Sequence, residues 1–372
     1  MNLSFWEYKE LFDSIDFTII GAGIVGSCTA LFLREKYPDA KILVLERGIT
    51  PLGASTRNAG FSCFGSISEI LDDLEHMSEE EIRALIQLRV QGLNLLQELV
   101  SPEDMQYEQQ GGYEVFSDTQ LEEYTASIPK INQWVEESTG LKDCFQLVGN
   151  SFNFGFGKQM IWNQYEGQLN PALMMKNLHR KLKQEKINIL FGSEVREVRA
   201  MRDSVEVQLE NLNFTTKILA SCTNAFSRGL FKNLDLVPAR NQVLITHKIP
   251  DLKIKGTFHY DKGYVYFRDY ENRLLIGGAR NIDLDTETTT AFGANDKIIK
   301  HLKNLVAEKI LPGVELSYEY EWSGIIATGK TKRPMIEQLE ERIYGGFRLG
   351  GMGVAIGSVV GKKLAALISQ NS

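Results

Sequence analysis

The sequence has few cysteines and few histidines, and neither type is clustered. The 372-residue chain contains five scattered histidines and four cysteines, at Cys28, Cys63, Cys144 and Cys222. No C-x-x-C pair occurs, although most structural zinc sites use closely spaced ligands. We therefore expect no metal site, and we expect the cysteines to be reduced thiols of a cytoplasmic protein.

Positive charge and long apolar runs are also scarce. The chain has 41 lysines and arginines against 48 aspartates and glutamates, a net charge of −7 with neutral histidines. This balance argues against nucleic acid, or an anionic membrane, as the main partner. Residues 17–33 carry no charge, but the stretch is short for a membrane span and contains three glycines. Residues 1–10 lack the apolar segment of a signal peptide, so we expect neither a leader nor a transmembrane helix.

The composition is that of an average globular protein, with 43% hydrophobic residues, 24% charged residues and 32 glycines. Such a composition excludes collagen, a disulfide scaffold and extensive disorder. At roughly 150 residues per domain, the length predicts two or three domains, or one large α/β unit with an insertion.

The beginning of the chain predicts a βαβ unit. Residues 16–20 and 41–46 are short apolar runs typical of buried strands, and residues 24–37 between them predict a helix. This order within about 30 residues is typical of a parallel sheet. Further along we expect helices at 69–77, 79–99, 119–137, 171–185 and 296–311, and strands at 111–116, 188–191, 195–199, 204–209, 214–220, 264–268, 273–277 and 315–322. A strand at 342–349, a glycine turn and a helix at 354–368 are expected to end the chain.

A glycine-rich turn joins the first strand to the first helix. Residues 21–26 fit G-x-G-x-x-G, in which the first glycine permits a tight turn, the second lets backbone approach a pyrophosphate and the third packs helix on strand. The amides at the start of the helix would then face the anion. Glu46 ends the second strand, 20 residues after Gly26, where a carboxylate can bind ribose hydroxyls and would repel a 2′-phosphate. We interpret the unit as a dinucleotide site; a plain βαβ unit with a glycine turn is the alternative.

Two later segments could complete such a site. Residues 53–60, Gly-Ala-Ser-Thr-Arg-Asn-Ala-Gly, combine backbone freedom with hydroxyl and amide groups that can bind pyrophosphate and ribityl oxygens. Gly351-Met352-Gly353 precedes the last helix, whose exposed amides could stabilise negative charge on a flat ring. The respective alternatives are an ordinary surface turn and a strand-to-helix turn that packs on the sheet.

Residues 324–331 fit a second nucleotide motif, the G-x-x-x-x-G-K-T pattern of a P-loop. A P-loop needs a buried strand before it and an unbroken helix after it. Here charged residues alternate along the preceding strand, and Pro334 would interrupt the helix. We therefore interpret this match as chance similarity.

Residues 21–26, Glu46-Arg47 and residues 53–60 together resemble the D-amino-acid-oxidase-like FAD-dependent oxidoreductases, which include glycine oxidase, monomeric sarcosine oxidase and gamma-glutamylputrescine oxidase. The resemblance extends over residues 16–368, through residues 166–171, 220–225, 266–278 and 350–361. It implies an α/β fold with a doubly wound, Rossmann-like FAD-binding domain of the glutathione-reductase type and a second, mixed α+β substrate domain. The first domain would comprise residues 1–85, 160–228 and 322–372, and the second residues 86–159 and 229–321.

The resemblance also implies a cofactor and a reaction. FAD would be bound non-covalently, because residues 324–329 lack the cysteine that carries the flavin in sarcosine oxidase. The expected reaction is oxidation of the C–N bond of a small-molecule amine or amino acid by hydride transfer to the flavin, with oxygen or another electron acceptor. The residues expected to contact FAD are Gly21, Gly23, Ile24, Val25, Gly26, Glu46, Arg47, Ser55, Thr56, Arg57, Asn58, Ala59, Gly60, Val195, Thr223, Asn224, Gly324, Gly351, Met352, Gly353 and Val354.

Three residues are candidates for orienting the substrate. Tyr266 and Arg268 lie on the strand expected at 264–268, and Arg348 precedes the last glycine turn; an arginine can hold a carboxylate through two parallel hydrogen bonds. Leu275 and Ala355 stand where sarcosine oxidase has lysines that support oxygen reactivity and substrate binding, so an acceptor other than oxygen is left open. A non-catalytic flavin- or nucleotide-binding protein and an NAD-dependent dehydrogenase are the alternatives.

Overall fold

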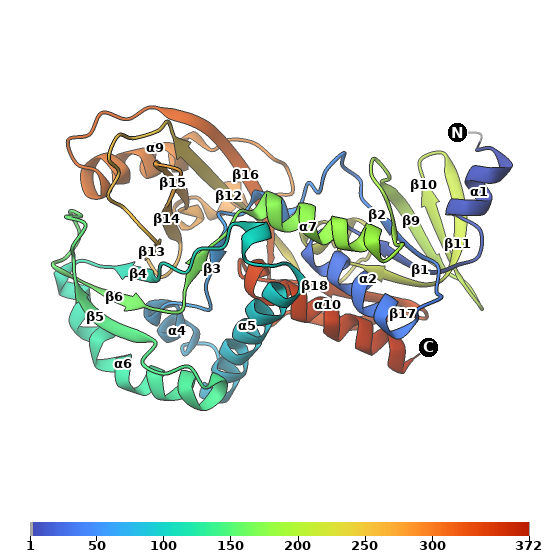
Figure 1. Cartoon of the computed structure of the whole chain (residues 1–372), viewed down its shortest axis with the longest axis horizontal. Coiled ribbons are helices and arrows are strands. Elements are labelled where there is room, and N and C mark those ends of the chain that lie inside the picture. The colour runs from blue at the N-terminus through green and yellow to red at the C-terminus, as the bar shows by residue number, and fades with distance from the viewer. Residues whose placement is uncertain (1–2, 372) are drawn as a thin grey trace.

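The computed structural model describes residues 3–371, so residues 1, 2 and 372 of the predicted first domain lie outside the described part. The chain forms two eight-stranded sheets, and a small sheet of β3 (Phe61–Ser62) and β7 (Gly167–Gln168). In Figure 1 the first sheet lies on the right and the second on the left, while α5, α7 and α10 lie near the middle. This mixed architecture confirms the predicted α/β fold class.

The first sheet contains the predicted βαβ unit. Five adjacent strands run parallel, because β18 pairs with β11, β11 with β1, β1 with β2 and β2 with β8 in the parallel sense. Strands buried on both faces are expected to be largely apolar. All four residues of β2 are apolar and buried, and β1 is buried from Phe17 to Ile20, with Thr18 its polar member there. In spatial order the strands are β17 (Met335–Glu340), β18 (Ile343–Phe347), β11 (Leu212–Ser221), β1 (Ile15–Ile20), β2 (Ile42–Leu45) and β8 (Asn188–Leu190), and β10 (Val205–Leu209) and β9 (Val195–Ala200) continue antiparallel from β11.

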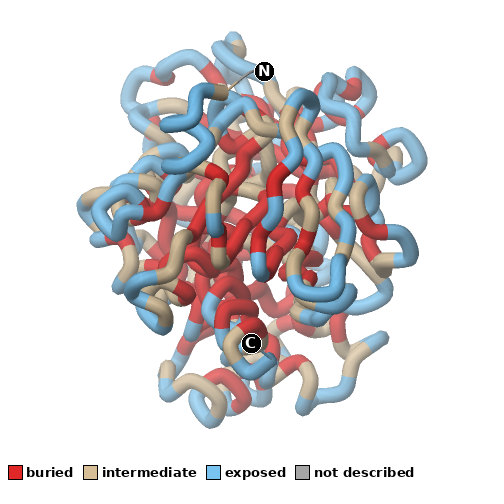
Figure 2. The backbone as a smooth tube through the Cα atoms, turned by 90° about the vertical axis from the view of Figure 1, so that its right-hand side faces the viewer, coloured by how far each residue is buried: buried red, intermediate tan, exposed pale blue. Residues whose placement is uncertain are grey.

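Helices complete this half of the molecule. The helix of the βαβ unit, α2 (Ile24–Lys36), packs against α7 (Pro171–Gln184) and against the final helix α10 (Gly353–Gln370), which also contacts α5 (Glu79–Leu99). A continuous apolar core joins these helices to β1 and β2. Figure 2, which faces the right-hand side of Figure 1, shows that the buried segments gather in the interior and that exposed segments surround them. The amino end of α10 is thereby held beside the amino end of α2.

The second sheet is antiparallel except where β13 runs parallel to β4. Phe258 and Phe267 stack on one of its faces with ring centroids 4.7 Å apart. The strands, in spatial order, are β16 (Tyr318–Thr328), β12 (Val237–Thr246), β15 (Arg273–Gly278), β14 (Val265–Tyr270), β13 (Thr257–Tyr260), β4 (Gly112–Val115), β6 (Gln159–Asn163) and β5 (Phe145–Gly149). The remaining helices are α1 (Phe5–Leu11), α3 (Ala54–Arg57), α4 (Ile67–Asp73), α6 (Asp118–Thr139), α8 (Leu284–Glu287) and α9 (Asp296–Leu305), with short helical turns at Glu103–Met105, Asn224–Gly229, Arg280–Ile282 and Val306–Ile310.

Several elements differ from the prediction in their bounds, and two of these differences have a clear cause. The strand expected at 315–322 is β16, which continues through Gly324 because this residue pairs with Asn241 of β12. Residues 329–334 form a turn without a helix, which removes the P-loop interpretation. The helix expected at 69–77 is α4, which starts earlier because Ser66 and Glu69 form a capping box.

The cysteines and the apolar helices were also the subject of sequence expectations. All four cysteines are free and buried. Within residues 3–371, no helix combines the length and the apolar character that crossing a membrane requires.

Candidate active site

The predicted glycine turn lies where β1, β2 and β11 end. Gly21 has a φ of +101°, and a Cβ there would lie 2.8 Å from the carbonyl oxygen of Cys222 on the neighbouring segment. A Cβ on Gly26 would lie 1.9 Å from the carbonyl oxygen of Gly21. Both positions therefore require glycine, and the helix start is held directly against the sheet edge.

Glu46 is buried beside this turn. Its Oε2 accepts a hydrogen bond from the Ala22 amide at 3.1 Å, and its Oε1 accepts one from the Gly48 amide at 3.1 Å. Each carboxylate oxygen can accept a second hydrogen bond. The carboxylate is thus fixed by backbone and retains acceptor capacity for hydroxyl groups in the adjoining cavity.

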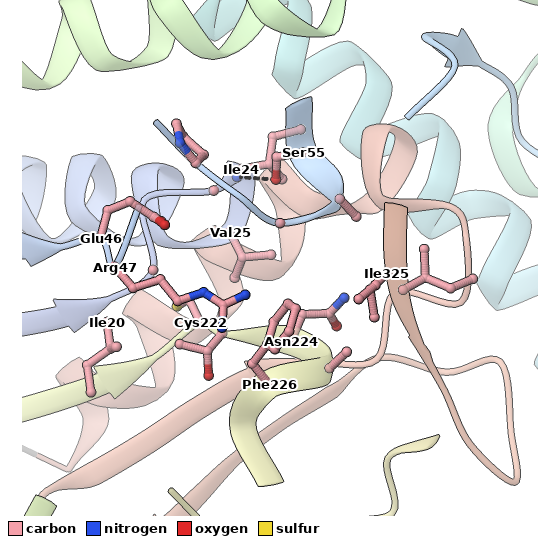
Figure 3. A pocket seen from close by; sticks show the side chains of 18 of the residues that line it. Ile20, Ile24, Val25, Glu46, Arg47, Ser55, Cys222, Asn224, Phe226 and Ile325 are labelled. Carbon is pink, nitrogen blue, oxygen red and sulfur yellow. Dashed lines mark hydrogen bonds between the residues drawn. The ribbon is translucent and has the colours of Figure 1, made fainter. Parts of the chain in front are cut away.

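A cavity of about 670 Å³ crosses the turn, which is within the usual range for a small-molecule site. The amino end of α2 faces it without a side-chain cap, and Ser55 Oγ accepts a hydrogen bond from the Ile24 amide at 3.0 Å (Figure 3). Such a helix end attracts a phosphate. The predicted residues that line this first cavity are Gly21, Gly23, Ile24, Val25, Glu46, Arg47, Ser55, Asn58, Val195, Thr223, Asn224, Gly351, Gly353 and Val354.

A second cavity of about 240 Å³ lies between the amino end of α10 and the second sheet. The two cavities share wall residues Ala54, Asn58, Ile326, Gly351 and Val354, so they adjoin, and we treat them together as one groove. The predicted residues that line the second cavity are Arg57, Asn58, Ala59, Tyr266, Gly324, Gly351, Met352 and Val354. The groove therefore joins the first glycine turn to the last one.

Three predicted contact residues stand behind these walls. Gly26 packs α2 on the sheet, as described above. Thr56 Oγ1 donates to the Pro51 carbonyl at 2.6 Å, and the Gly60 amide donates to Asn58 Oδ1 at 2.8 Å. Thr56 and Gly60 thus determine the shape of the loop, and none of the three residues lines either cavity.

The structure brings neither Arg268 nor Arg348 to the first or the second cavity. Arg268 donates to the Leu169 carbonyl at 3.1 Å, and its burial lowers the pKa of the guanidinium to about 10. Arg348 is ion-paired with Asp235 and donates to the Arg333 carbonyl at 2.9 Å. Arg268 Nε is buried without a hydrogen-bond partner, but neither arginine lines the first or the second cavity, so we leave both out of the substrate site.

Sequence reasoning missed most of the polar groups around the second cavity, which are Glu69, Asp72, Asn241, His259, Lys262, Tyr264, Arg280 and Lys332. They come from helix α4 and from separate strands and turns, so no single local pattern joins them. His259 is the cross-strand neighbour of Tyr266, and only the register of the β13–β14 hairpin reveals this relation.

The charges around the second cavity are unevenly paired. Lys262 is bound to Asp72 at 2.6 Å, and Lys332 to the buried Asp73. Arg280 instead lies over the Tyr264 ring at 5.3 Å, and within the described part of the chain no carboxylate forms an ion pair with it. The cavity thus contains a cation able to bind an anionic ligand.

Three buried side chains of the kinds that can bind a metal ion lie together at the edge of the second cavity. One ligand atom from each of Cys63, Glu166 and His259 lies within 4.8 Å of the others. These three residues lie far apart along the chain, so no sequence motif indicated the cluster. Since His259 Nε2 and Glu166 Oε2 bond directly at 2.9 Å, the arrangement is that of an ion pair.

Comparison with known proteins agrees with this geometry. Residues 16–367 match the family described as FAD dependent oxidoreductase (DAO). The probable oxidoreductase OrdL of Haemophilus influenzae is 22% identical over 372 residues, which cover 95% of this chain and 82% of that protein. The structure of L-proline dehydrogenase from P. horikoshii superposes with a TM-score of 0.77 at 17% identity, over 97% of this chain and 94% of that one. Glycine oxidase from Geobacillus kaustophilus gives a TM-score of 0.77 at 17% identity, over 96% and 95%. By its family match, and with the fold that these structures share, the chain belongs to the FAD-dependent oxidoreductase (DAO) family, as its glycine-rich segments predicted.

Proposed function

We propose that the chain binds FAD non-covalently along the groove and uses it to oxidise the C–N bond of an amino acid or a related amine. The observation that carries the proposal is that two adjoining cavities extend from the Gly21 turn to the amino end of α10. In this arrangement the first sheet and its helices form the FAD-binding domain, and the second sheet forms the substrate domain. Strands β6 and β16 belong to the second sheet, so the proposed domain boundaries move to about residues 166 and 329.

The residues of the groove suit each part of FAD. Glu46 would bind the adenosine ribose, and the amides at the start of α2 would bind the pyrophosphate. A Cβ on Gly351 would find only Ile326 Cδ1, at 3.8 Å, so the wall below the second cavity is open to a flat ring. The flavin supplies the hydride acceptor, and the amino end of α10 would stabilise the negative charge that develops there.

The charges of the second cavity support an amino acid as substrate. Arg280 is available to bind a carboxylate, and the nearby Tyr266 lines the same space with a hydroxyl whose pKa is raised by burial. These groups would hold the substrate's carbon next to nitrogen over the ring while the walls exclude water. A proline dehydrogenase and a glycine oxidase with the same fold are consistent with this substrate class.

The experiment that tests the proposal is anaerobic titration of the purified flavoprotein with a panel of amino acids and amines. We expect at least one member to bleach the flavin absorbance, and carboxylate-bearing members to do so at the lowest concentrations. Readmission of air, with and without an artificial acceptor, then measures whether oxygen reoxidises the flavin. Acid precipitation should leave the flavin in the supernatant if it is bound non-covalently.

Two outcomes would contradict the proposal. Protein that takes up no flavin on reconstitution would remove the assignment of the groove. Protein that binds FAD but is bleached by no member of a broad panel would favour the non-catalytic alternative. The family match itself disfavours the NAD-dependent alternative.

A further inference from the structure

His259 and Glu166 form a buried pair at the wall of the second cavity. His259 lies on β13, opposite Tyr266 of β14, and its side chain lines the cavity. Its Nε2 is 2.9 Å from Glu166 Oε2, and the two residues are only 5% and 1% exposed. The ring of Phe61 packs edge-on against both His259 and Tyr266, with centroid distances of 5.4 and 5.6 Å. The imidazole is therefore held in one orientation beside the proposed substrate space.

The carboxylate of Glu166 depends on His259 for charge balance. Thr257 Oγ1 donates to it at 3.3 Å and Asn163 Nδ2 at 3.4 Å, and both groups are neutral. Among the described residues, neither lysine nor arginine forms an ion pair with Glu166. A buried carboxylate without a cation is costly, so the pair has a high affinity for one proton on the imidazole.

The other ring nitrogen of His259 is available to a ligand. Nε2 is directed at Glu166, whereas no described residue forms a hydrogen bond with Nδ1. A carboxylate that accepts from one nitrogen fixes the tautomer and makes the other nitrogen more basic. In the neutral imidazole, Nδ1 therefore carries the lone pair, on a side chain that lines the second cavity.

We infer that His259, oriented by Glu166, accepts the proton that the substrate's ammonium group must lose before its C–H bond can be oxidised. The inference rests on the proposed function. An N–H bond of the ammonium breaks, its electron pair stays on nitrogen, and the proton bonds to Nδ1. The C–H bond would then break, with its electron pair leaving as hydride to the acceptor that bound FAD would supply, while the nitrogen lone pair forms the C=N bond. The proton on the imidazole is released to water after the product leaves.

The acid strengths of the two groups suit this transfer. Burial lowers the pKa of His259, but the neighbouring Glu166 carboxylate more than reverses this effect and raises the pKa to about 9. A simple alkylammonium such as that of lysine titrates at about 10.4. Donor and acceptor are therefore closely matched, which favours general base catalysis near the pKa of the base.

Other titratable groups also face His259. Glu114 of β4 is paired with His259 in the register of the sheet. Burial raises the pKa of Glu114 to about 7, although hydrogen bonds from Ser68 and Ser66 lower it. Glu69 of α4 adds a further negative charge that raises the pKa of His259. The thiol of Cys63 stays protonated, because burial raises its pKa well above the usual value. Lys262, in the turn after β13, is neutralised by Asp72.

The test compares the pH dependence of anaerobic flavin reduction in the wild type, His259→Gln and Glu166→Gln. In the wild type we expect the apparent kcat/KM to rise with pH through a midpoint near 9. In His259→Gln this rise of kcat/KM with pH should be absent. Below the midpoint, the rate of flavin reduction should be at least about 100-fold lower than in the wild type. In Glu166→Gln the rise of kcat/KM should move to lower pH. Burial still lowers the pKa of His259, and the carboxylate of Glu166 no longer raises it. His301→Gln, which replaces an exposed histidine, is the matched control and should behave like the wild type.

Two further measurements separate a catalytic role from a structural one. NMR titration of ligand-free protein should show a histidine that titrates near pH 9, absent in His259→Gln and shifted downward in Glu166→Gln. In His259→Gly, added imidazole should restore flavin reduction. A rise of kcat/KM with pH that persists unchanged in His259→Gln belongs to the substrate's own ammonium and would overturn the inference. Failure of the wild type itself to be bleached would instead refute the proposed function.

Discussion

Replacement of Glu46 by glutamine tests the assignment of the nucleotide half of the groove. The two carboxylate oxygens accept hydrogen bonds from the amides of Ala22 and Gly48, at 3.1 Å each. Glutamine offers only one acceptor oxygen. Its NH₂ group, a donor, must therefore face one of these two backbone N–H groups, and that hydrogen bond is lost. The substitution also removes the negative charge that would strengthen hydrogen bonds from ribose hydroxyls.

The expected magnitude follows from the hydrogen bonds lost. A hydrogen bond to a charged group contributes about 1.5–3 kcal/mol, and 1.4 kcal/mol corresponds to about tenfold in a dissociation constant. Glu46→Gln should therefore weaken FAD binding by roughly 10- to 100-fold. The assay is titration of the apoprotein with FAD, with ADP and with FMN, followed by protein fluorescence.

The three ligands distinguish the role of the residue. FAD and ADP contain the adenosine ribose and should bind more weakly, whereas FMN lacks it and should bind as before. Glu35→Gln makes the same change of charge at an exposed position of α2 and should alter none of the three constants. An equal loss of affinity for FMN and FAD would show that Glu46 acts through the general stability of the fold, and the reasoning would be refuted.

Three other predictions concern separate parts of the molecule. Gly351→Leu should reduce flavin content at least tenfold, because the new side chain would extend into the open wall of the cavity at a φ of +84°, and absorbance of the purified protein measures it. Arg280→Met should raise the KM for a carboxylate-bearing substrate by roughly 10- to 100-fold with little change for a simple amine, which steady-state kinetics can check. Glu287→Gln should destabilise the protein by about 3–5 kcal/mol in urea unfolding, because Glu287 and Arg240 form an ion pair that is almost wholly buried.

Matched controls make these three results interpretable. Gly313→Leu imposes a comparable backbone strain, at a φ of +79°, where a Cβ meets no atom within 4 Å, and flavin content should be unchanged. Arg202→Met removes an exposed arginine and should leave both KM values unaltered. Glu321→Gln breaks a half-exposed pair with Lys303 and should change stability by no more than about 1 kcal/mol. Equal effects in a variant and its control would contradict the corresponding prediction.

The nucleotide half of the groove could be predicted because its signals are local. The apolar runs of β1 and β2, the glycines between them and Glu46 all lie within a single βαβ unit, and the geometry of such a unit is stereotyped. The glycine turn before α10 is equally local. In both places the ligand would be met by backbone, and the requirement for glycine is visible in the sequence itself.

The substrate half could not be predicted in the same way, because strand alternation does not show what covers a strand. Tyr266 and Arg268 are two residues apart and project from the same face of β14. Tyr266 lines the cavity, yet Arg268 lies beneath Leu169 and beside Gly60. Arg348 adopts a φ of +60° and is engaged by Asp235; nothing in its neighbours predicted that conformation.

The distance between paired residues along the chain explains the remaining misses. His259 and Glu166 are brought together only when β13, β4 and β6 form one sheet, and each of these pairings joins distant segments. A site built from such side chains can change without disturbing the backbone turns that would hold the flavin. It follows that substitutions at His259 or Arg280 should alter substrate turnover in a protein that retains its flavin, whereas a side chain at Gly26 should remove both.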